Sequence, residues 1–403
     1  VSGISTPCVF MNEQMGLRAV VHGDDFTILG DDESLDWFRE KIQERFEVKV
    51  KGRLGGGKKD VQSMRILNRI VTYFWDRIEY EPDQRHADII MKQLGINSQS
   101  RSVTTPGVDE PLEGDETLLE GSEATLYRGI SARGNYLGQD RSDIRFAIKE
   151  ISRHMSAPRV RDMGLLKRVG RYLAGVPRVV CIFAAQNMPK YIDVWTDSNW
   201  AGCKETRKST SGGFIQWGGH PIKHWSTTQT VIALSSGEAE YYAMVKGGSQ
   251  GLGLKGLMED WKLQVKIKIK TDATAAKGIA SRRGLGAVRH IETNQLWLQD
   301  QCYRGKIEVE KIGTKENIAD ACTKHVNGET LETHLTMGGM VKRNGRHEMT
   351  LAFNEDEEYG NDPPGSSEGE VCYVGPDCDA EKEDPRMENA PFGKKGKPCD
   401  SQE

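Results

Sequence analysis

The chain has 403 residues, of which 37% are hydrophobic and 28% are charged, and its formal net charge is −4. This length is enough for two or three domains with cores of their own. No stretch reaches the roughly 18 consecutive apolar residues that a membrane helix needs, so we expect no membrane partner. Eight cysteines without a CxxC pair argue against a zinc site and favour a reducing, intracellular compartment, either cytoplasm or nucleus.

The charge is unevenly distributed along the chain. Residues 354–403 contain 15 acidic and 5 basic residues, which leaves a net charge of +6 on the rest. A mildly basic body suits a nucleic-acid backbone as partner, although a solvated surface explains the same composition. The acidic stretch has few large apolar residues, and we expect it to be disordered from about residue 354.

The first hundred residues combine strand-like and helical patterns. Residues 17–30 (LRAVVHGDDFTILG) alternate about a Gly-Asp turn and predict a β-hairpin. Further strand-like runs extend to Tyr80, and residues 83–96 have a helical pattern. Between these segments the spacing predicts a helix whose apolar stripe contains Leu35, Phe38, Ile42 and Phe46.

The remainder divides into three further segments. Residues 97–122 are rich in Ser, Pro, Gly and acids, which predicts a linker. Residues 123–176 have apolar positions at helical spacing and predict a helical unit. In residues 190–326 three strand-like runs precede a helix, a strand and another helix, which predicts a mixed α/β sheet with flanking helices.

Four acidic residues lie at element ends in that last segment, namely Asp197, Glu238, Asp272 and Asp320. Taken singly, each has a structural explanation. Asp197 could end a strand at a turn, and Asp320 could face solvent. Glu238 could complete a capping box that begins at Ser235, and Asp272 could cap a helix. Taken together, their order and their positions at element ends favour one shared site.

The chemistry of phosphodiester hydrolysis explains why such acids would gather. In-line hydrolysis uses one ion to activate water and a second to stabilise the leaving oxygen, about 3.5–4 Å apart. Mg²⁺ prefers oxygen ligands, so carboxylates are its natural protein ligands, and Mn²⁺ suits the same set. The acids therefore predict a site for two divalent ions.

Three segments resemble the Pol polyproteins of copia-type LTR retrotransposons. SSGEAEYYA (235–243) is similar to the SSTEAEY segment of that family, and RKSTSGG (207–213) to its RKSTSG turn. Residues 126–158, from LYRGISARG to RHMSAP, resemble the connection that precedes its ribonuclease H domain. The resemblance implies a C-terminal fragment containing the end of a reverse transcriptase and a ribonuclease H domain. It also implies that Asp197, Glu238, Asp272 and Asp320 are the catalytic, metal-binding acids.

The sequence departs from this pattern in two places. The family's basic run before its His-Ile pair is reduced here to AVRHIET, which keeps Arg289 and His290. Cellular ribonucleases H carry a histidine in the loop before the last helix, whereas the loop here is IGTKEN. A role in proton transfer or product release must then lie elsewhere, with His290 and Lys315 as candidates, or be absent. A surface position is the simpler explanation of His290.

The hairpin VVHGDDFTILG resembles the palm hairpin of reverse transcriptases, with Asp24 and Asp25 at the turn. A palm needs a third carboxylate from an earlier strand, and about twenty residues precede this hairpin. We therefore expect a polymerase remnant that does not polymerise alone. Lys266, Lys268 and Lys270 alternate with apolar residues on a predicted strand, and the pattern leaves open whether they contact nucleic acid.

The predicted organisation has four segments: a truncated palm and thumb (1–100), a linker and connection (101–189), a ribonuclease H-like domain (190–326) and a C-terminal extension (327–403). The expected function is metal-dependent cleavage of RNA in RNA–DNA hybrids, with the rest of a Pol polyprotein as a possible partner. Candidate nucleic-acid contacts are Arg207, Lys208, Arg289 and His290. The alternatives are an inactive relic that binds nucleic acid and an interaction protein that uses the acidic tail.

Overall fold

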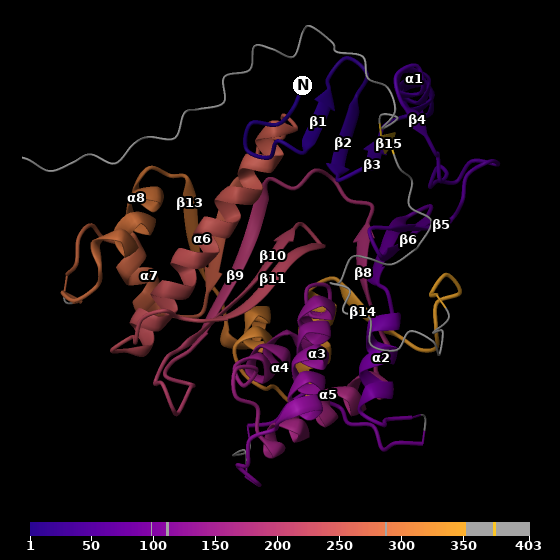
Figure 1. The fold of residues 1–403 in the computed structure, drawn as a ribbon. Coiled ribbons are helices and arrows are strands. Elements are labelled where there is room, and N and C mark those ends of the chain that lie inside the picture. The colour runs from indigo at the N-terminus through magenta and orange to yellow at the C-terminus, as the bar shows by residue number, and fades with distance from the viewer. Residues whose placement is uncertain (98, 110–112, 287, 352–373, 376–403) are drawn as a thin grey trace, which may run out of the picture.

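The computed structural model describes residues 1–351 except 98, 110–112 and 287, together with Val374 and Gly375. We expect disorder from about residue 354. Apart from Val374 and Gly375, the residues in that range lie outside the described part of the chain. The chain forms a mixed α/β structure with two five-stranded sheets and a three-stranded sheet (Figure 1). None of its described helices has the length and hydropathy of a membrane span.

The sheet of the 190–326 segment has the strand order β11-β10-β9-β12-β13. Its first three strands in sequence pair antiparallel, and the last two run parallel to β9. The predicted mixed sheet with flanking helices is therefore present. The strands are β9 (Tyr191–Asn199), β10 (Thr210–Trp217), β11 (His220–Thr228), β12 (Lys266–Thr271) and β13 (Ile307–Lys311).

The long helix α6 (Ser236–Asp260) packs closely on this sheet. Glycines make the close approach possible, because a Cβ at Gly247 would lie 2.6 Å from the Thr196 side chain and one at Gly251 3.0 Å from that of Ile267. Two shorter helices, α7 (Thr274–Ser281) and α8 (Trp297–Tyr303), and the turn η2 (Thr293–Leu296) complete this flank. The shared core includes Ile192, Val194, Ile267, Ile269 and Leu298.

The second five-stranded sheet combines distant parts of the sequence in the order β14-β8-β7-β6-β5. It joins strands from three of the predicted segments. The first three in sequence come from the truncated palm and thumb, one comes from the end of the connection, and one comes from the C-terminal extension. Its strands are β5 (Ser63–Ile66), β6 (Arg69–Phe74), β7 (Arg77–Pro82), β8 (Arg178–Ala184) and β14 (Met340–Arg343), and α9 (Gly328–Met337) precedes the last of them.

The helical unit predicted for residues 123–176 is present and has its own core. It consists of α3 (Gly121–Leu137), α4 (Ser142–Ser152), η1 (Val160–Asp162) and α5 (Met163–Gly175), with α2 (Arg85–Gln93) packed against it. Arg141 and Asp143 form a buried ion pair of 2.7 Å, and the Tyr172 hydroxyl donates to the same carboxylate. Because both charges are paired and hydrogen-bonded, their burial is tolerated.

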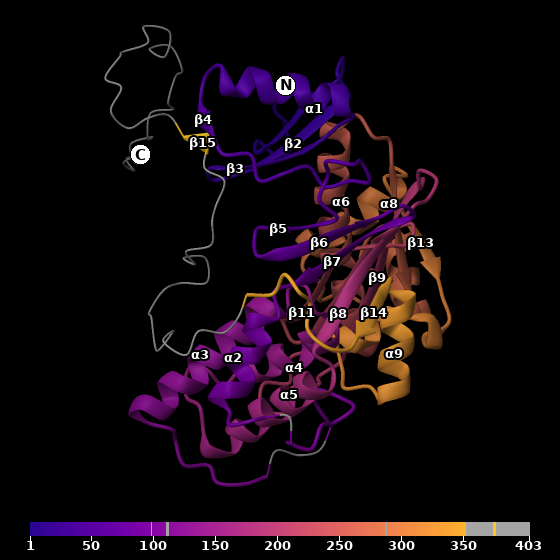
Figure 2. The same ribbon diagram turned by 90° about the vertical axis from the view of Figure 1, so that its right-hand side faces the viewer.

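The N-terminal segment forms the predicted hairpin, with β2 (Leu17–His22) and β3 (Asp25–Leu29) joined through Gly23 at φ 59°. A third strand, β1 (Val9–Asn12), completes the sheet, and α1 (Asp32–Gln43) follows. A short strand β4 (Glu47–Val48) pairs with β15 (Val374–Gly375). Figures 1 and 2 show α1 and the three-stranded β1–β3 sheet at the opposite end of the molecule from α2–α5.

Candidate metal centre

Three carboxylates converge at one edge of the β9–β13 sheet. Asp197 lies near the end of β9, Asp272 directly follows β12, and Glu240 lies in the second turn of α6. One ligand atom from each of the three lies within 4.8 Å of the others. Among the described residues this is the one group of three or more histidine, cysteine or acidic side chains with such spacing.

The register of two parallel strands places Asp197 beside Asp272. The last pair between β9 and β12 is Trp195 with Lys270. Continuing this register by two residues sets Asp197 opposite Asp272, and because the strands are parallel both carboxylates emerge at the same sheet edge. The backbone N–H of Ser198 donates to Glu240 Oε1 over 3.2 Å, which ties α6 to the end of β9.

The structure does not bring Glu238 into this group, and Glu240 lies there instead. Two residues along a helix correspond to about 200° of rotation, so the two carboxylates leave α6 in different directions. Glu238 lies three residues after the N-cap Ser235, whose hydroxyl accepts from its N–H at 3.2 Å. Its own carboxylate accepts from the Leu234 N–H, 2.9 Å away. Ser235 therefore caps the helix, whereas the Glu238 carboxylate accepts from the residue before the cap and not from the Ser235 N–H, as the capping box of the alternative explanation would require.

Asp320 lies beside the three acids, on the turn η4 (Ile318–Cys322). Its Oδ2 is 3.0 Å from the Lys324 ammonium, and its charge acts on Asp197. The next residue after η4 also contributes, because the Thr323 hydroxyl donates to Asp197 Oδ2. The sequence-predicted Asp197, Asp272 and Asp320 are therefore brought together, with Asp320 paired to a lysine.

Burial and crowding oppose ionisation of these acids. Burial and then the charge of Asp320 raise the pKa of Asp197. Burial, Asp197 and Asp272 likewise raise the pKa of Glu240. Burial acts to lower the pKa of the Lys324 ammonium, but the charges of Asp197 and Asp320 outweigh it and raise that pKa. The site therefore gathers more acidic side chains than the Lys324 ammonium alone can neutralise.

The donor set fits a divalent cation. All the converging atoms are carboxylate oxygens, the ligands that Mg²⁺ and Mn²⁺ accept. Two further oxygens, Glu240 Oε2 and Asp320 Oδ1, are buried and have no hydrogen-bond partner among the described residues. A cation would satisfy these oxygens and relieve the repulsion among the acids, so metal binding and carboxylate ionisation should be coupled.

Asn317 is a further polar residue of the site that sequence reasoning missed. Its side-chain amide donates to the Thr196 carbonyl over 3.0 Å and approaches Asp272 Oδ1 at 3.5 Å. The residue is fully buried, and it thereby connects η4 to both β9 and the end of β12. Its position three residues before Asp320, with Thr323 three residues after, is a spacing that could have indicated a shared face.

The other candidate residues lie outside this group. Arg207 and Arg289 are exposed and Lys208 is half-buried, on the loops that follow β9 and α7. Lys315 lies on the turn η3 (Thr314–Glu316). At the other end of the molecule, Asp24 is exposed and Asp25 half-buried at the β2–β3 turn, and neither belongs to a cluster of three acids among the described residues.

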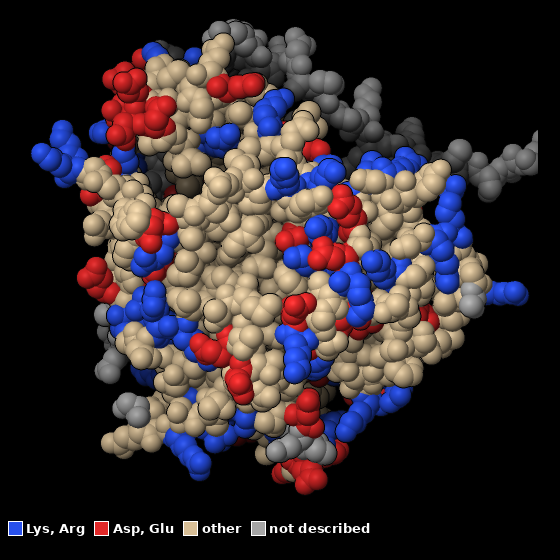
Figure 3. All heavy atoms as spheres, turned by 180° about the vertical axis from the view of Figure 1, so that it is seen from behind, with Lys and Arg blue, Asp and Glu red and all other residues tan. Residues whose placement is uncertain are grey.

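The alternating lysines of β12 have acidic partners. Lys268 is 3.0 Å from Glu310 and Lys270 is 3.1 Å from Asp193, while Lys266 lies 3.6 Å from Glu308. Each of the three lysines therefore has an ion-pair partner within the sheet, and a contact with nucleic acid stays an open question. On the face seen in Figure 3, basic and acidic side chains are interspersed and do not form a continuous basic stripe.

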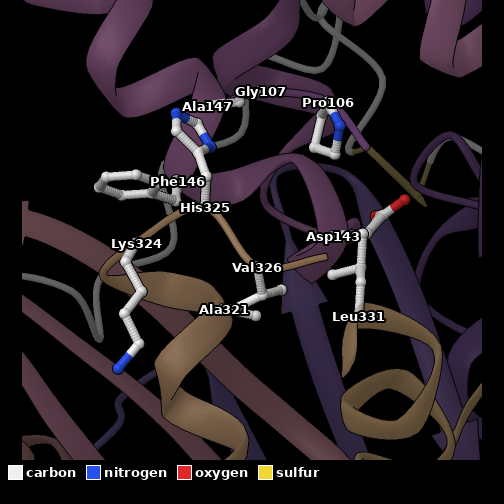
Figure 4. Close-up of a pocket in the computed structure, with 10 residues that line it drawn as sticks. All are labelled: Pro106, Gly107, Asp143, Phe146, Ala147, Ala321, Lys324, His325, Val326 and Leu331. Atoms are coloured by element: carbon white, nitrogen blue, oxygen red, sulfur yellow. The ribbon is translucent and has the colours of Figure 1, made fainter. Parts of the chain in front are cut away.

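A small hollow lies between η4 and the helical unit (Figure 4). Its volume of about 10 Å³ is room for one water molecule at most. Lys324 lines it, but Figure 4 shows the ammonium turned away from the other lining residues. The hollow is therefore no substrate pocket, and the lysine serves the acids instead.

Comparison with known proteins identifies several relatives, although no family model matches the chain. The retrovirus-related Pol polyprotein from transposon RE1 of Arabidopsis thaliana is 27% identical over 246 residues, which are 60% of this chain and 17% of the relative. That from transposon TNT 1-94 of Nicotiana tabacum is 29% identical over 350 residues, 83% of this chain and 26% of the relative. The chain thus spans at most about a quarter of these relatives.

Two further similarities are shorter. An uncharacterized mitochondrial protein of Arabidopsis thaliana is 36% identical over 161 residues, 40% of this chain and 65% of that protein. The solved structure of LC11-RNase H1, isolated from compost, covers 36% of this chain and 99% of its own at 15% identity and a TM-score of 0.25. At that TM-score the likeness bears on neither fold nor function.

Proposed function

Because this chain is a homologue of the retrovirus-related Pol polyproteins of copia-type transposons, we propose that it is a metal-dependent nuclease that cleaves the RNA strand of RNA–DNA hybrids. The observation that carries the proposal is the convergence of Asp197, Glu240 and Asp272 within 4.8 Å. The strand order β11-β10-β9-β12-β13, with α6 across it, supports a ribonuclease H-like fold around that site.

Asp197, Glu240 and Asp272 would hold the divalent ions, and Asp320 would complete the ligand set. Two such ions, when bound, would supply an activated water and neutralise charge on the leaving oxygen. The chain itself contributes orientation. The Ser198 N–H fixes one oxygen of Glu240, the Thr323 hydroxyl fixes one oxygen of Asp197, and the Asn317 amide faces Asp272.

Substrate recognition would rest on the sugar-phosphate backbone. A protein distinguishes RNA from DNA by the 2′-hydroxyl and by the shape of the helix. The exposed Arg207 and Arg289, together with Lys208, lie on loops that follow β9 and α7, two of the elements around the site. We propose that these residues contact phosphates of the hybrid, which would make binding dependent on salt concentration.

Polymerase activity is not part of this proposal. Asp24 and Asp25 occupy a hairpin turn as the palm resemblance implies, but no third carboxylate of the described residues joins them in a metal-binding group. The proposed nuclease would act with the remainder of a Pol polyprotein, whose other parts would synthesise the DNA strand.

Cleavage of an end-labelled RNA–DNA hybrid tests the proposal. We expect RNA fragments with Mg²⁺ or Mn²⁺, none with EDTA, and no cleavage of single-stranded or double-stranded RNA of the same sequence. Binding of the hybrid without cleavage in either metal would favour the alternative, a relic that binds nucleic acid without turnover.

A further inference from the structure

Glu238 makes a set of contacts that the proposed nuclease site does not use. Its side chain is 1% exposed. The Tyr242 hydroxyl donates to Oε1 over 2.7 Å, and His290 Nε2 donates to Oε2 over 2.7 Å, beside the hydrogen bond from Leu234. The carboxylate is therefore a buried anchor that accepts three hydrogen bonds from within the protein.

His290 comes to this anchor from the loop between α7 and α8. The loop projects beside these helices in Figure 1. At its start it is held by Gln299, whose Oε1 accepts from the Gly284 N–H at 2.9 Å and whose amide donates to the Gly284 carbonyl at 3.1 Å. Near its end Ile291 is buried. Between these points the hydrogen bond from His290 ties the loop to α6.

The neighbour of His290 is an exposed cation. Arg289 is exposed and forms no ion pair within the described part of the chain. It directly precedes His290, whose ring is bound to Glu238 in the first turn of α6, and Glu240 lies in the second turn of the same helix. Fixing His290 therefore also fixes where the Arg289 backbone stands relative to the three acids.

We propose that Glu238 and His290 form a clamp that positions Arg289 to contact a phosphate of the bound nucleic-acid strand next to the metal centre. Both are positioning residues, because neither reaches the converging carboxylates. The inference rests on the proposed function and adds to it a determinant of substrate affinity. It also gives His290, whose side chain is 44% exposed, a role other than that of a surface residue or a proton donor.

The clamp predicts coupling between Arg289 and His290 in hybrid binding. We would measure dissociation constants for a fluorescent RNA–DNA hybrid by anisotropy in the Asp197→Asn background, so that no turnover is needed. Arg289→Ala should weaken binding about 5-fold, as expected for one lost phosphate contact of about 1 kcal/mol. In a His290→Phe background, which keeps a ring but no donor, the same change should weaken binding less than 2-fold.

Three controls separate the clamp from general damage. His290→Gln keeps an N–H donor and should restore most of the affinity lost in His290→Phe. Lys306→Ala removes an exposed cation before β13, at the sheet end opposite the acids, and should leave affinity within 1.5-fold of the parent. Hydrogen exchange of residues 282–292 in the free protein should be faster in His290→Phe than in the parent.

Each outcome decides the matter. Additive effects of Arg289→Ala and His290→Phe, or unchanged loop exchange in His290→Phe, would overturn the clamp. In turnover experiments His290→Phe should raise KM with kcat within about 2-fold, and a loss confined to kcat would make His290 catalytic and overturn the positioning role. If the Asp197→Asn parent does not bind the hybrid at all, the proposed function is wrong, and the positioning of Arg289 for a phosphate is wrong with it. Faster hydrogen exchange in His290→Phe would then show only that His290 holds the loop to α6.

Discussion

The backbone N–H of Ser198 donates to Oε1 of Glu240 over 3.2 Å and so joins the end of β9 to the second turn of α6. This hydrogen bond sets one carboxylate from a helix beside two that come from neighbouring parallel strands. The other oxygen of Glu240 remains buried without a partner among the described residues, which is the arrangement expected of a ligand atom.

The first prediction concerns Asp197, at the centre of the acid group. Asp197→Asn keeps the side-chain shape and removes one charged ligand, so hybrid cleavage should fall by roughly 10²-fold or more. The melting temperature should hold or rise, because carboxylate repulsion is relieved. Asp193→Asn is the matched control on the same strand, where the side chain pairs with Lys270 away from the acids. Cleavage by Asp197→Asn at the rate of this control would remove Asp197 from the site.

The second prediction concerns stability and pH in the absence of metal. The folded protein raises the pKa values of Asp197 and Glu240, chiefly through burial, so it holds protons that the unfolded chain releases near pH 4. The resulting stabilisation is present below that pH and is lost as pH rises through the raised values. The melting temperature in EDTA should therefore decline from weakly acidic to alkaline pH, by several degrees.

Excess Mg²⁺ should reverse most of this decline, since a ligand at 10–100 times its dissociation constant stabilises by about 1.4–2.7 kcal/mol. Asp197→Asn should show a shallower decline in EDTA. A melting temperature in EDTA that rises over the same pH range would contradict the raised pKa values.

The third prediction concerns Lys324, whose ammonium lies 3.0 Å from Asp320. Lys324→Met removes a positive charge that competes with the metal ions for the same acids. Calorimetric titration should show Mg²⁺ binding tightened roughly 3- to 10-fold, or about 0.7–1.4 kcal/mol. Lys270→Met, which breaks an ion pair with Asp193 outside the site, should leave Mg²⁺ affinity unchanged. Weaker Mg²⁺ binding in Lys324→Met would show that the lysine supports the site and does not compete with metal.

The fourth prediction separates the structural and functional parts of Asn317. Asn317→Ala leaves the Thr196 carbonyl without its donor, and the free energy of unfolding should fall by about 1–3 kcal/mol. Hybrid cleavage at a temperature where the variant is folded should fall as well, because Asp272 loses its neighbour. Asn327→Ala removes the N-cap of α9 and should cost about 1 kcal/mol without affecting cleavage. Equal cleavage by the two variants would limit Asn317 to a structural role.

The sequence predicted those parts of the fold that depend on local patterns. Alternation about Gly23 predicted the β2–β3 hairpin, and helical spacing predicted the helical unit before Pro177. The sheet that joins β14 to β8 was beyond this reasoning, because it pairs Met340 with Cys181 across 159 residues and no local pattern encodes such a pairing.

The site was predicted in the same uneven way. Asp197 and Asp272 could be found because each lies at or just beyond the end of a strand-like run, and the parallel register then brings them together. The choice between Glu238 and Glu240 could not be made from a motif in which both appear. It depends on which side of α6 faces β9, and that is decided by the close packing of Gly247 and Gly251 rather than by either glutamate.

The most direct test of the account compares Glu240→Gln with Glu238→Gln on one labelled RNA–DNA hybrid in Mg²⁺, with the melting temperature of each preparation measured alongside. The account predicts that Glu240→Gln is folded and loses at least about 10²-fold in kcat. It predicts that Glu238→Gln keeps kcat within about 2-fold and loses affinity for the hybrid. A folded Glu240→Gln that cleaves at the wild-type rate, with cleavage abolished in a folded Glu238→Gln, would contradict it.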